Sequence, residues 1–225
     1  MLEISHHMLA GVLLVTGAAV FFGIGFGSAA LHTDLAKSGG AGSDDGLRAI
    51  GREPRAWRII PRSFAVATVL NTLGYGMLAI KQMDAGERAL SVTGITLLLI
   101  AAPTFIGSLA FNVSAVVDAG TEAASGSVPD WFRPLYGWSE TLYRAYMILA
   151  YFGIGAFGVS LMLVGPLIPI WLAAGLIVFG VGWATSFVIG RPRIGDFVPS
   201  DLPLWVHVAS LALGLALVFA PAGAS

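Results

Sequence analysis

Long apolar runs separated by short polar stretches dominate this chain. Six of these runs contain no Asp, Glu, Lys or Arg, and they cover Met8 to Ala30, Ser63 to Ile80, Ser91 to Val117, Ala145 to Val164, Leu167 to Gly190 and Leu204 to Ala220. A helix needs about 20 mainly apolar residues to cross about 30 Å of hydrocarbon, whereas the strands of a membrane barrel would alternate in polarity. The pattern therefore predicts an all-α, polytopic integral membrane protein, a helical bundle of six transmembrane helices that forms a single domain.

The composition agrees with this pattern. The chain has 225 residues, of which 56% are hydrophobic and only 11% are charged, whereas soluble domains carry about 25% charged residues. A net charge of -1 provides no general attraction to nucleic acid. Cysteine is absent, which excludes disulfides, thiolate catalysis and cysteine-ligated metal centres.

Lysine and arginine divide unequally between the two sides of such a bundle. One side has Lys81 and Arg88, and the other has ten basic residues, namely Lys37, Arg48, Arg52, Arg55, Arg58, Arg62, Arg133, Arg144, Arg191 and Arg193. The positive-inside rule then places the loops after the first, third and fifth spans in the cytoplasm and both termini outside. The first span lacks the basic flank of a signal peptide and is expected to remain. We expect a prokaryotic cytoplasmic membrane protein.

The longest polar stretch, residues 33–58, is expected to be a cytoplasmic loop. Near its end, Leu47 to Ile60 is predicted to form a short amphipathic helix on the lipid headgroups, with Trp57 inserted and the arginines turned toward phosphate or water. Asp44 and Asp45 suit its N-terminus, where carboxylates favour the helix dipole. The alternative is an ordinary loop whose positive charge sets the topology.

A second interfacial segment, Pro129 to Tyr146, is rich in aromatic residues. These are Trp131, Phe132, Tyr136, Trp138, Tyr143 and Tyr146. Aromatic rings favour the membrane boundary, so a simple aromatic belt is one interpretation. The other is a docking shelf for a flat ligand or a partner helix.

Few polar side chains remain inside the spans, and they define the candidate ligand pocket. Its residues are Asn71, Tyr75, Ser108, Asn112 and Trp183. An amide facing lipid would leave hydrogen-bonding atoms unsatisfied, so both asparagines should face the bundle interior. Pro103 is expected to kink the third span and open space beside them. The alternative is that the amides only bridge helices.

Histidine raises a haem hypothesis. His32 ends the first span and His207 lies about one turn into the sixth span from the same side, so two neutral imidazoles could hold a b-type haem iron. The polar setting of His32 argues against this, and no cofactor is predicted. No catalytic residue and no other metal ligand are predicted either, because the chain lacks a Walker loop, a dinucleotide fingerprint and a G-x-S-x-G motif. Glu140 and Arg144 are expected to form an ion pair on a helix surface.

The last third of the chain carries a family resemblance. The segments Ala150 to Gly158, Gly165 to Leu172 and Pro203 to His207 resemble small uncharacterised prokaryotic multi-spanning membrane proteins, in which a Pro-x-Trp-Leu hairpin joins two late helices. The resemblance implies the architecture and no catalytic residue.

The expected function is non-enzymatic. We expect an accessory or scaffold subunit of a membrane complex, or a binder of a small apolar molecule or lipid, whose partners are membrane lipids and other membrane subunits and not nucleic acid. A passive transporter or facilitator is the alternative, and a b-type haem electron carrier is the third. Ion-coupled carriers usually place an acidic residue at mid-membrane, and these spans contain none.

Overall fold

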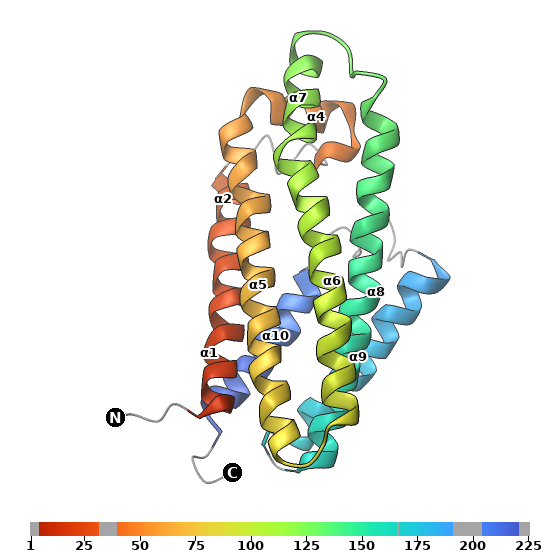
Figure 1. Ribbon diagram of the computed structural model, residues 1–225. Helices are drawn as coiled ribbons and strands as arrows, with labels where there is room; N and C mark the ends of the chain where they lie inside the picture. Colours follow the sequence, from red (N-terminus) through yellow and green to blue (C-terminus); the bar gives the residue numbers. More distant parts are fainter. Residues whose placement is uncertain (1–4, 32–39, 166, 191–203, 221–225) are drawn as a thin grey trace. The chain divides into compact units, whose positions relative to one another are not determined.

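The computed structural model describes residues 5–31, 40–165, 167–190 and 204–220, and every element in them is helical (Figure 1). The elements are α1 (His6–Ala19), the π-helical η1 (Val20–Phe26), α2 (Gly27–Leu31), the 3-10 turn η2 (Gly40–Gly42), α4 (Asp44–Arg52), α5 (Pro54–Asp84), α6 (Ala89–Val113), α7 (Ala115–Ser125), α8 (Phe132–Val164), α9 (Ile170–Ile189) and α10 (Leu204–Val218). The all-α prediction is confirmed for these residues.

Five helical stretches among the described residues are long and apolar enough to cross a membrane. They are His6–Phe26, Pro54–Asp84, Ala89–Ser125, Phe132–Val164 and Ile170–Ile189. The sixth predicted span corresponds to α10, which is apolar but has only 15 residues. The structure therefore supports a helical membrane protein, and the count of six rests on the sequence.

Three spans are longer than the apolar runs suggested. The runs from Ser63, Ser91 and Ala145 lie inside helices that extend to Pro54–Asp84, Ala89–Ser125 and Phe132–Val164. An apolar run stops at the first charged residue, whereas a helix continues because its backbone hydrogen bonds are local. Pro61 and Pro103 lie inside α5 and α6, which continue through them.

The chain divides into two compact units. The first unit comprises Met1–Ala18, Val69–Ala102 and Arg144–Ser225, and the second comprises Ala19–Thr68 and Pro103–Tyr143. In the first unit, Gly11 of α1 and Gly214 of α10 lie so close that a β-carbon on Gly11 would be 2.8 Å from the Gly214 carbonyl oxygen. Small residues at such contacts allow helix backbones to pack tightly.

In the second unit, α4 packs against α7 (Figure 1). The side chains of Leu47, Ile50, Val116 and Phe132 are fully buried in a shared apolar core. Ser43 caps α4 by accepting a hydrogen bond from the Gly46 N–H at 3.0 Å. The apolar side of α4 is therefore covered by protein.

This arrangement corrects the prediction of one headgroup helix from Leu47 to Ile60. The segment is helical but divided at Glu53, whose φ of -126° and ψ of 53° are not helical. The cause is Pro54, because a proline ring disfavours helical backbone at the residue before it. Asp44 and Asp45 occupy the first turn of α4 as expected.

Candidate functional site

A buried polar pair joins α5 to α10 in the first unit. Asn71 is 5% exposed and His207 is fully buried. The amide Nδ2 of Asn71 lies 2.7 Å from the imidazole Nδ1 of His207. The prediction that Asn71 faces the protein interior is confirmed.

A second pair lies one turn further along both helices. The hydroxyl oxygens of Tyr75 and Ser210 are 3.3 Å apart. Ser210 donates its own proton to the Val206 carbonyl at 2.9 Å, so the Tyr75 hydroxyl is the donor between them. We call Asn71, Tyr75, His207 and Ser210 together the α5–α10 polar seam.

The Oδ1 atom of Asn71 is buried and makes no hydrogen bond to another described residue. A flip of the Asn71 amide would exchange the positions of Oδ1 and Nδ2. In either orientation, one of these two atoms is left without a hydrogen bond to a described residue. A buried polar atom in this state costs free energy, and it can accept or donate one hydrogen bond to a small polar ligand.

Trp183 lies among aromatic rings of the first unit. Its ring stacks on Tyr151 of α8, with centroids 6.1 Å apart, and on Trp205 of α10, with centroids 6.4 Å apart. The hydroxyl of Tyr151 is buried and has no hydrogen-bond partner in the part of the chain that the structure describes. The surroundings of Trp183 are thus mainly apolar.

Ser108 and Asn112 belong to the second unit. Ser108 Oγ lies 2.9 Å from Ser139 Oγ of α8, and the Asn112 amide donates to the Ser108 carbonyl at 2.9 Å within α6. The five predicted pocket residues therefore divide into two groups, each described within its own unit. Asn71, Tyr75 and Ser108 make contacts of the helix-bridging kind that was the alternative interpretation, whereas the Asn112 amide bonds within its own helix. A shared ligand pocket stays a prediction.

The haem hypothesis depends on His32, which lies outside the described residues. Its proposed partner, His207, is bonded to Asn71. Across residues 5–31, 40–165, 167–190 and 204–220, no group of three or more His, Asp or Glu side chains could hold a metal ion. Haem ligation therefore stays a prediction of the sequence alone.

A polar contact that the sequence did not single out links Glu87 to Ser160. The Glu87 carboxylate accepts the N–H groups of Leu90 and Ser91 at 2.9 and 3.0 Å, which caps the first turn of α6, and it also accepts the Ser160 hydroxyl from α8. Burial alone would raise the pKa of Glu87, but these hydrogen bonds outweigh it and lower the pKa below its ordinary value. An acidic residue just before an apolar run is a usable signal for the cap. Ser160 has no such signal.

Two side chains of the second unit bind the C-terminal end of α6. Trp57 donates its indole N–H to the Asn112 carbonyl at 3.1 Å, and Arg58 donates to the Val113 carbonyl at 3.3 Å. The last carbonyls of a helix lack helical partners, so such donors are favourable there. Trp57 thus contacts protein through its indole N–H, and its insertion among headgroups stays a prediction.

Other arginines also serve internal contacts. Arg133 donates to the Gly42 carbonyl at 2.9 Å and forms an ion pair with Asp44. Arg144, which we expected to pair with Glu140 on its own helix, donates through Nε and Nη2 to the Phe187 carbonyl of α9 at 3.0 and 2.6 Å. These charges hold helices together.

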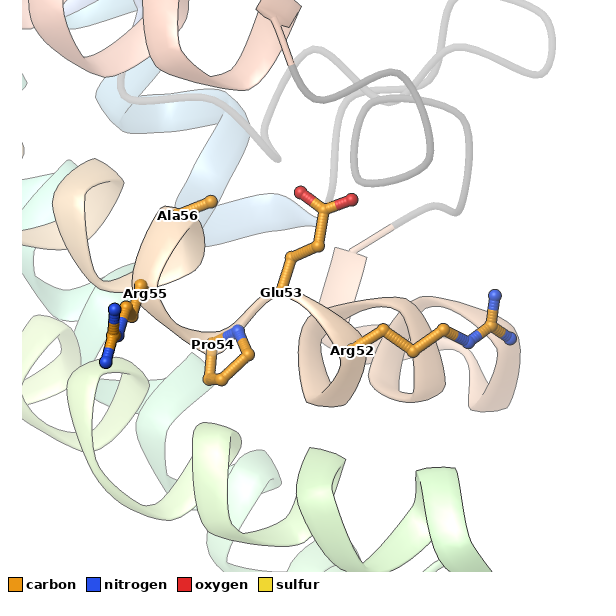
Figure 2. Close-up of a pocket in the computed structure, with 5 residues that line it drawn as sticks. All are labelled: Arg52, Glu53, Pro54, Arg55 and Ala56. Carbon is orange, nitrogen blue, oxygen red and sulfur yellow. The ribbon is translucent and has the colours of Figure 1, made fainter.

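A shallow depression of about 370 Å³ lies at the junction of α4 and α5. It is lined by Arg52, Glu53, Pro54, Arg55 and Ala56. Figure 2 shows the side chains of Arg52 and Arg55 extending to opposite sides of Pro54, with the Glu53 carboxylate in a third direction. The charged groups do not converge on one ligand atom.

Comparisons with known proteins identify no matching family model, no matching curated protein and no matching solved structure.

Proposed function

We propose that this chain is a non-enzymatic integral membrane protein that serves as an accessory or scaffold subunit of a membrane complex. The observation that carries the proposal is an exposed apolar stripe where α8 begins. Trp131, Leu135 and Trp138 follow one another at helical spacing, and they are 40%, 48% and 61% exposed. We call these three residues the α8 stripe.

The position of the stripe along α8 argues for a protein partner. Arg144 of α8 bonds to Phe187, two residues before α9 ends at Ile189. In this proposal, the boundary of the hydrocarbon lies at the level of Arg144. Counted along the axis of α8, Trp138 lies about 9 Å and Leu135 about 14 Å beyond Arg144. The headgroup layer on each side of a bilayer is only about 5–8 Å thick. Leu135 and Trp131 therefore extend past the lipid.

An apolar stripe that lies outside the lipid is exposed to water, which is unfavourable. Covering it would lower the free energy by about 25 cal/mol for each Å² of apolar surface buried. Tryptophan is also enriched at the centres of protein interfaces. A partner subunit that covers the α8 stripe accounts for both properties. This is the docking-shelf interpretation of the segment Pro129 to Tyr146.

The proposal includes six spans, with α10 as the sixth, in a prokaryotic cytoplasmic membrane with both termini outside. The division of lysine and arginine supports this orientation. Since α10 has 15 residues and covers about 22 Å, the bilayer would thin locally beside it. The second unit's α4, α7 and the start of α8 would then face the cytoplasm.

Site-specific photocrosslinking in cells tests the partner. A photoreactive phenylalanine analogue at Trp138 should cross-link to one discrete membrane protein, whereas the same analogue at Val178, which is 74% exposed within the α9 span, should cross-link to lipid. Leu135→Glu should reduce the protein cross-link at position 138 without changing the amount of folded protein. Cross-links to lipid alone at position 138 would contradict the proposal.

A further inference from the structure

We propose that Arg55 and Arg62 of α5 form a binding site for the headgroups of anionic phospholipids at the membrane boundary. The site rests on the membrane location of α5 and not on the partner surface of α8. Its evidence is the exposure of these two side chains, the face of the helix that they share, and their depth along the helix.

Of the seven described arginines on the predicted cytoplasmic side, four make contacts within the protein. Arg48 pairs with Asp45 at 3.2 Å, and Arg58, Arg133 and Arg144 bond to backbone carbonyls of other elements. Arg52, Arg55 and Arg62 are exposed, and none of them bonds to another described residue. Their guanidinium groups are therefore available to an outside anion.

Arg55 and Arg62 share one face of α5 with apolar side chains. The exposed residues Arg55, Ile59, Arg62 and Val66 are spaced by four, three and four positions, which places them in one row along the helix. Ile59 is 45% exposed and Val66 is 52% exposed. The row continues into the span through Val69 and Leu73, which are also exposed. A ligand with a phosphate and acyl chains matches this row.

The depth of Arg62 also fits a lipid phosphate. From Arg62 to Lys81, α5 rises about 28 Å, close to the roughly 30 Å of a bilayer's hydrocarbon core. These two cations therefore bracket the hydrocarbon, and Arg62 lies at the level of the phosphates. Arg55 is about 10 Å further out, and its long side chain can bend back toward the headgroups. The guanidinium fork binds phosphate oxygens through two parallel hydrogen bonds.

The nearest acidic group on this segment does not oppose such a ligand. Glu53 is two residues from Arg55, and its carboxylate points away from the Arg55 guanidinium (Figure 2). Arg52 lies on the other side of Pro54, so it contributes charge to this end of the protein but not to the row (Figure 2). Arg52 is therefore a matched control, since it is an exposed arginine with no bonded partner among the described residues.

The test is lipid-dependent thermal stability of the purified full-length protein in detergent. Added phosphatidylglycerol should raise the melting temperature more than phosphatidylcholine with the same acyl chains. In Arg55→Gln/Arg62→Gln, the apparent affinity for phosphatidylglycerol should fall about 25-fold, and about fivefold for each single substitution. Arg52→Gln should retain the wild-type response. Native mass spectrometry of Arg62→Gln gives an independent count of retained anionic lipids, which should decrease.

Three results would overturn the site. They are equal stabilisation of the wild type by the two lipids, an equal loss of response in Arg52→Gln, or a shift with inorganic phosphate as large as that with phosphatidylglycerol. The last would identify a binding site for a free anion. None of these results bears on the photocrosslinking of Trp138, so the two proposals fail independently.

Discussion

Gly51 of α4 and Gly120 of α7 bring two helix backbones into direct contact. A β-carbon on Gly51 would lie 1.9 Å from the carbonyl oxygen of Gly120, closer than any side chain can be placed. Leu47 and Ile50, on the same helix, are fully buried in the core that this contact closes. The packing of α4 on α7 therefore requires a glycine at position 51.

Gly51→Ala should loosen α4 from α7. We expect a loss of about 1–3 kcal/mol in stability, because the methyl group overpacks a backbone contact, and the higher helix propensity of alanine offsets only about 1 kcal/mol. Limited trypsin digestion should show faster cleavage after Arg48 and Arg52.

The control is Gly137→Ala in α8, since a β-carbon there would meet no atom within 4 Å. It should leave the cleavage rate unchanged or lower it. Equal cleavage of both variants would show that the contact at Gly51 does not hold α4 in place.

A double-mutant cycle on Asn71→Leu and His207→Phe should reveal their coupling. Polar side-chain contacts inside membrane proteins contribute about 0.6 kcal/mol on average and up to about 1.7 kcal/mol. We expect a coupling energy within this range, measured by reversible unfolding in mixed micelles. Thr93→Val is the control partner, because the exposed Thr93 hydroxyl bonds only to the Ala89 carbonyl of its own helix. Its effect should add to that of Asn71→Leu within about 0.5 kcal/mol.

Protonation of Glu87 should weaken the contact of α6 with α8. The folded protein lowers the pKa of Glu87 below the ordinary value of 4.5, so the unfolded chain binds this proton more readily. The stabilisation is complete above about pH 4.5, and it is lost as the pH falls through the lower folded-state pKa.

Thermal melts between pH 6 and pH 3 provide the measurement. Glu87→Gln should be less stable than the wild type at pH 6, and the difference should shrink toward pH 3. The control Glu122→Gln changes an exposed carboxylate in α7 and should show a smaller difference at pH 6. A gap between Glu87→Gln and the wild type that stays constant with pH would contradict the assignment.

The membrane orientation can be tested with single cysteines, because the chain has none of its own. Ala85 and Ser125 are exposed residues at the α5–α6 turn and at the end of α7. Ala85→Cys should react with a membrane-impermeant maleimide in intact cells, and Ser125→Cys only after permeabilisation. The reverse pattern would invert the proposed orientation.

Much of the helical architecture follows from the sequence, because hydropathy is a local property. A run of about 20 apolar residues is stable in lipid only as a helix, whatever its neighbours are. The same reasoning predicts that Asn71 is buried, since the cost of exposing an amide to lipid does not depend on which partner the amide finds. The acidic start of α4 at Asp44 and Asp45 is local in the same way.

Tertiary structure alone decides which polar groups meet. Asn71 and His207 are 136 positions apart in the chain, and their contact depends on how α5 and α10 are rotated about their axes. A small change in that rotation changes the hydrophobic free energy very little. No local pattern in the sequence therefore specifies which polar group Asn71 contacts. Arg144 illustrates the same limit, because helical spacing favours Glu140 whereas packing offers the Phe187 carbonyl of α9.

The lengths of the helices and the cover over α4 are also tertiary outcomes. Apolar runs end where charge begins, but α8 starts at Phe132 because that ring is buried in the core with Leu47 and Ile50. An amphipathic segment such as α4 can place its apolar side on lipid or on protein with a similar hydrophobic gain. The close contact of Gly51 with Gly120 places the apolar side of α4 on α7. The fit of two backbones depends on both helices together, so neither sequence segment alone predicts it.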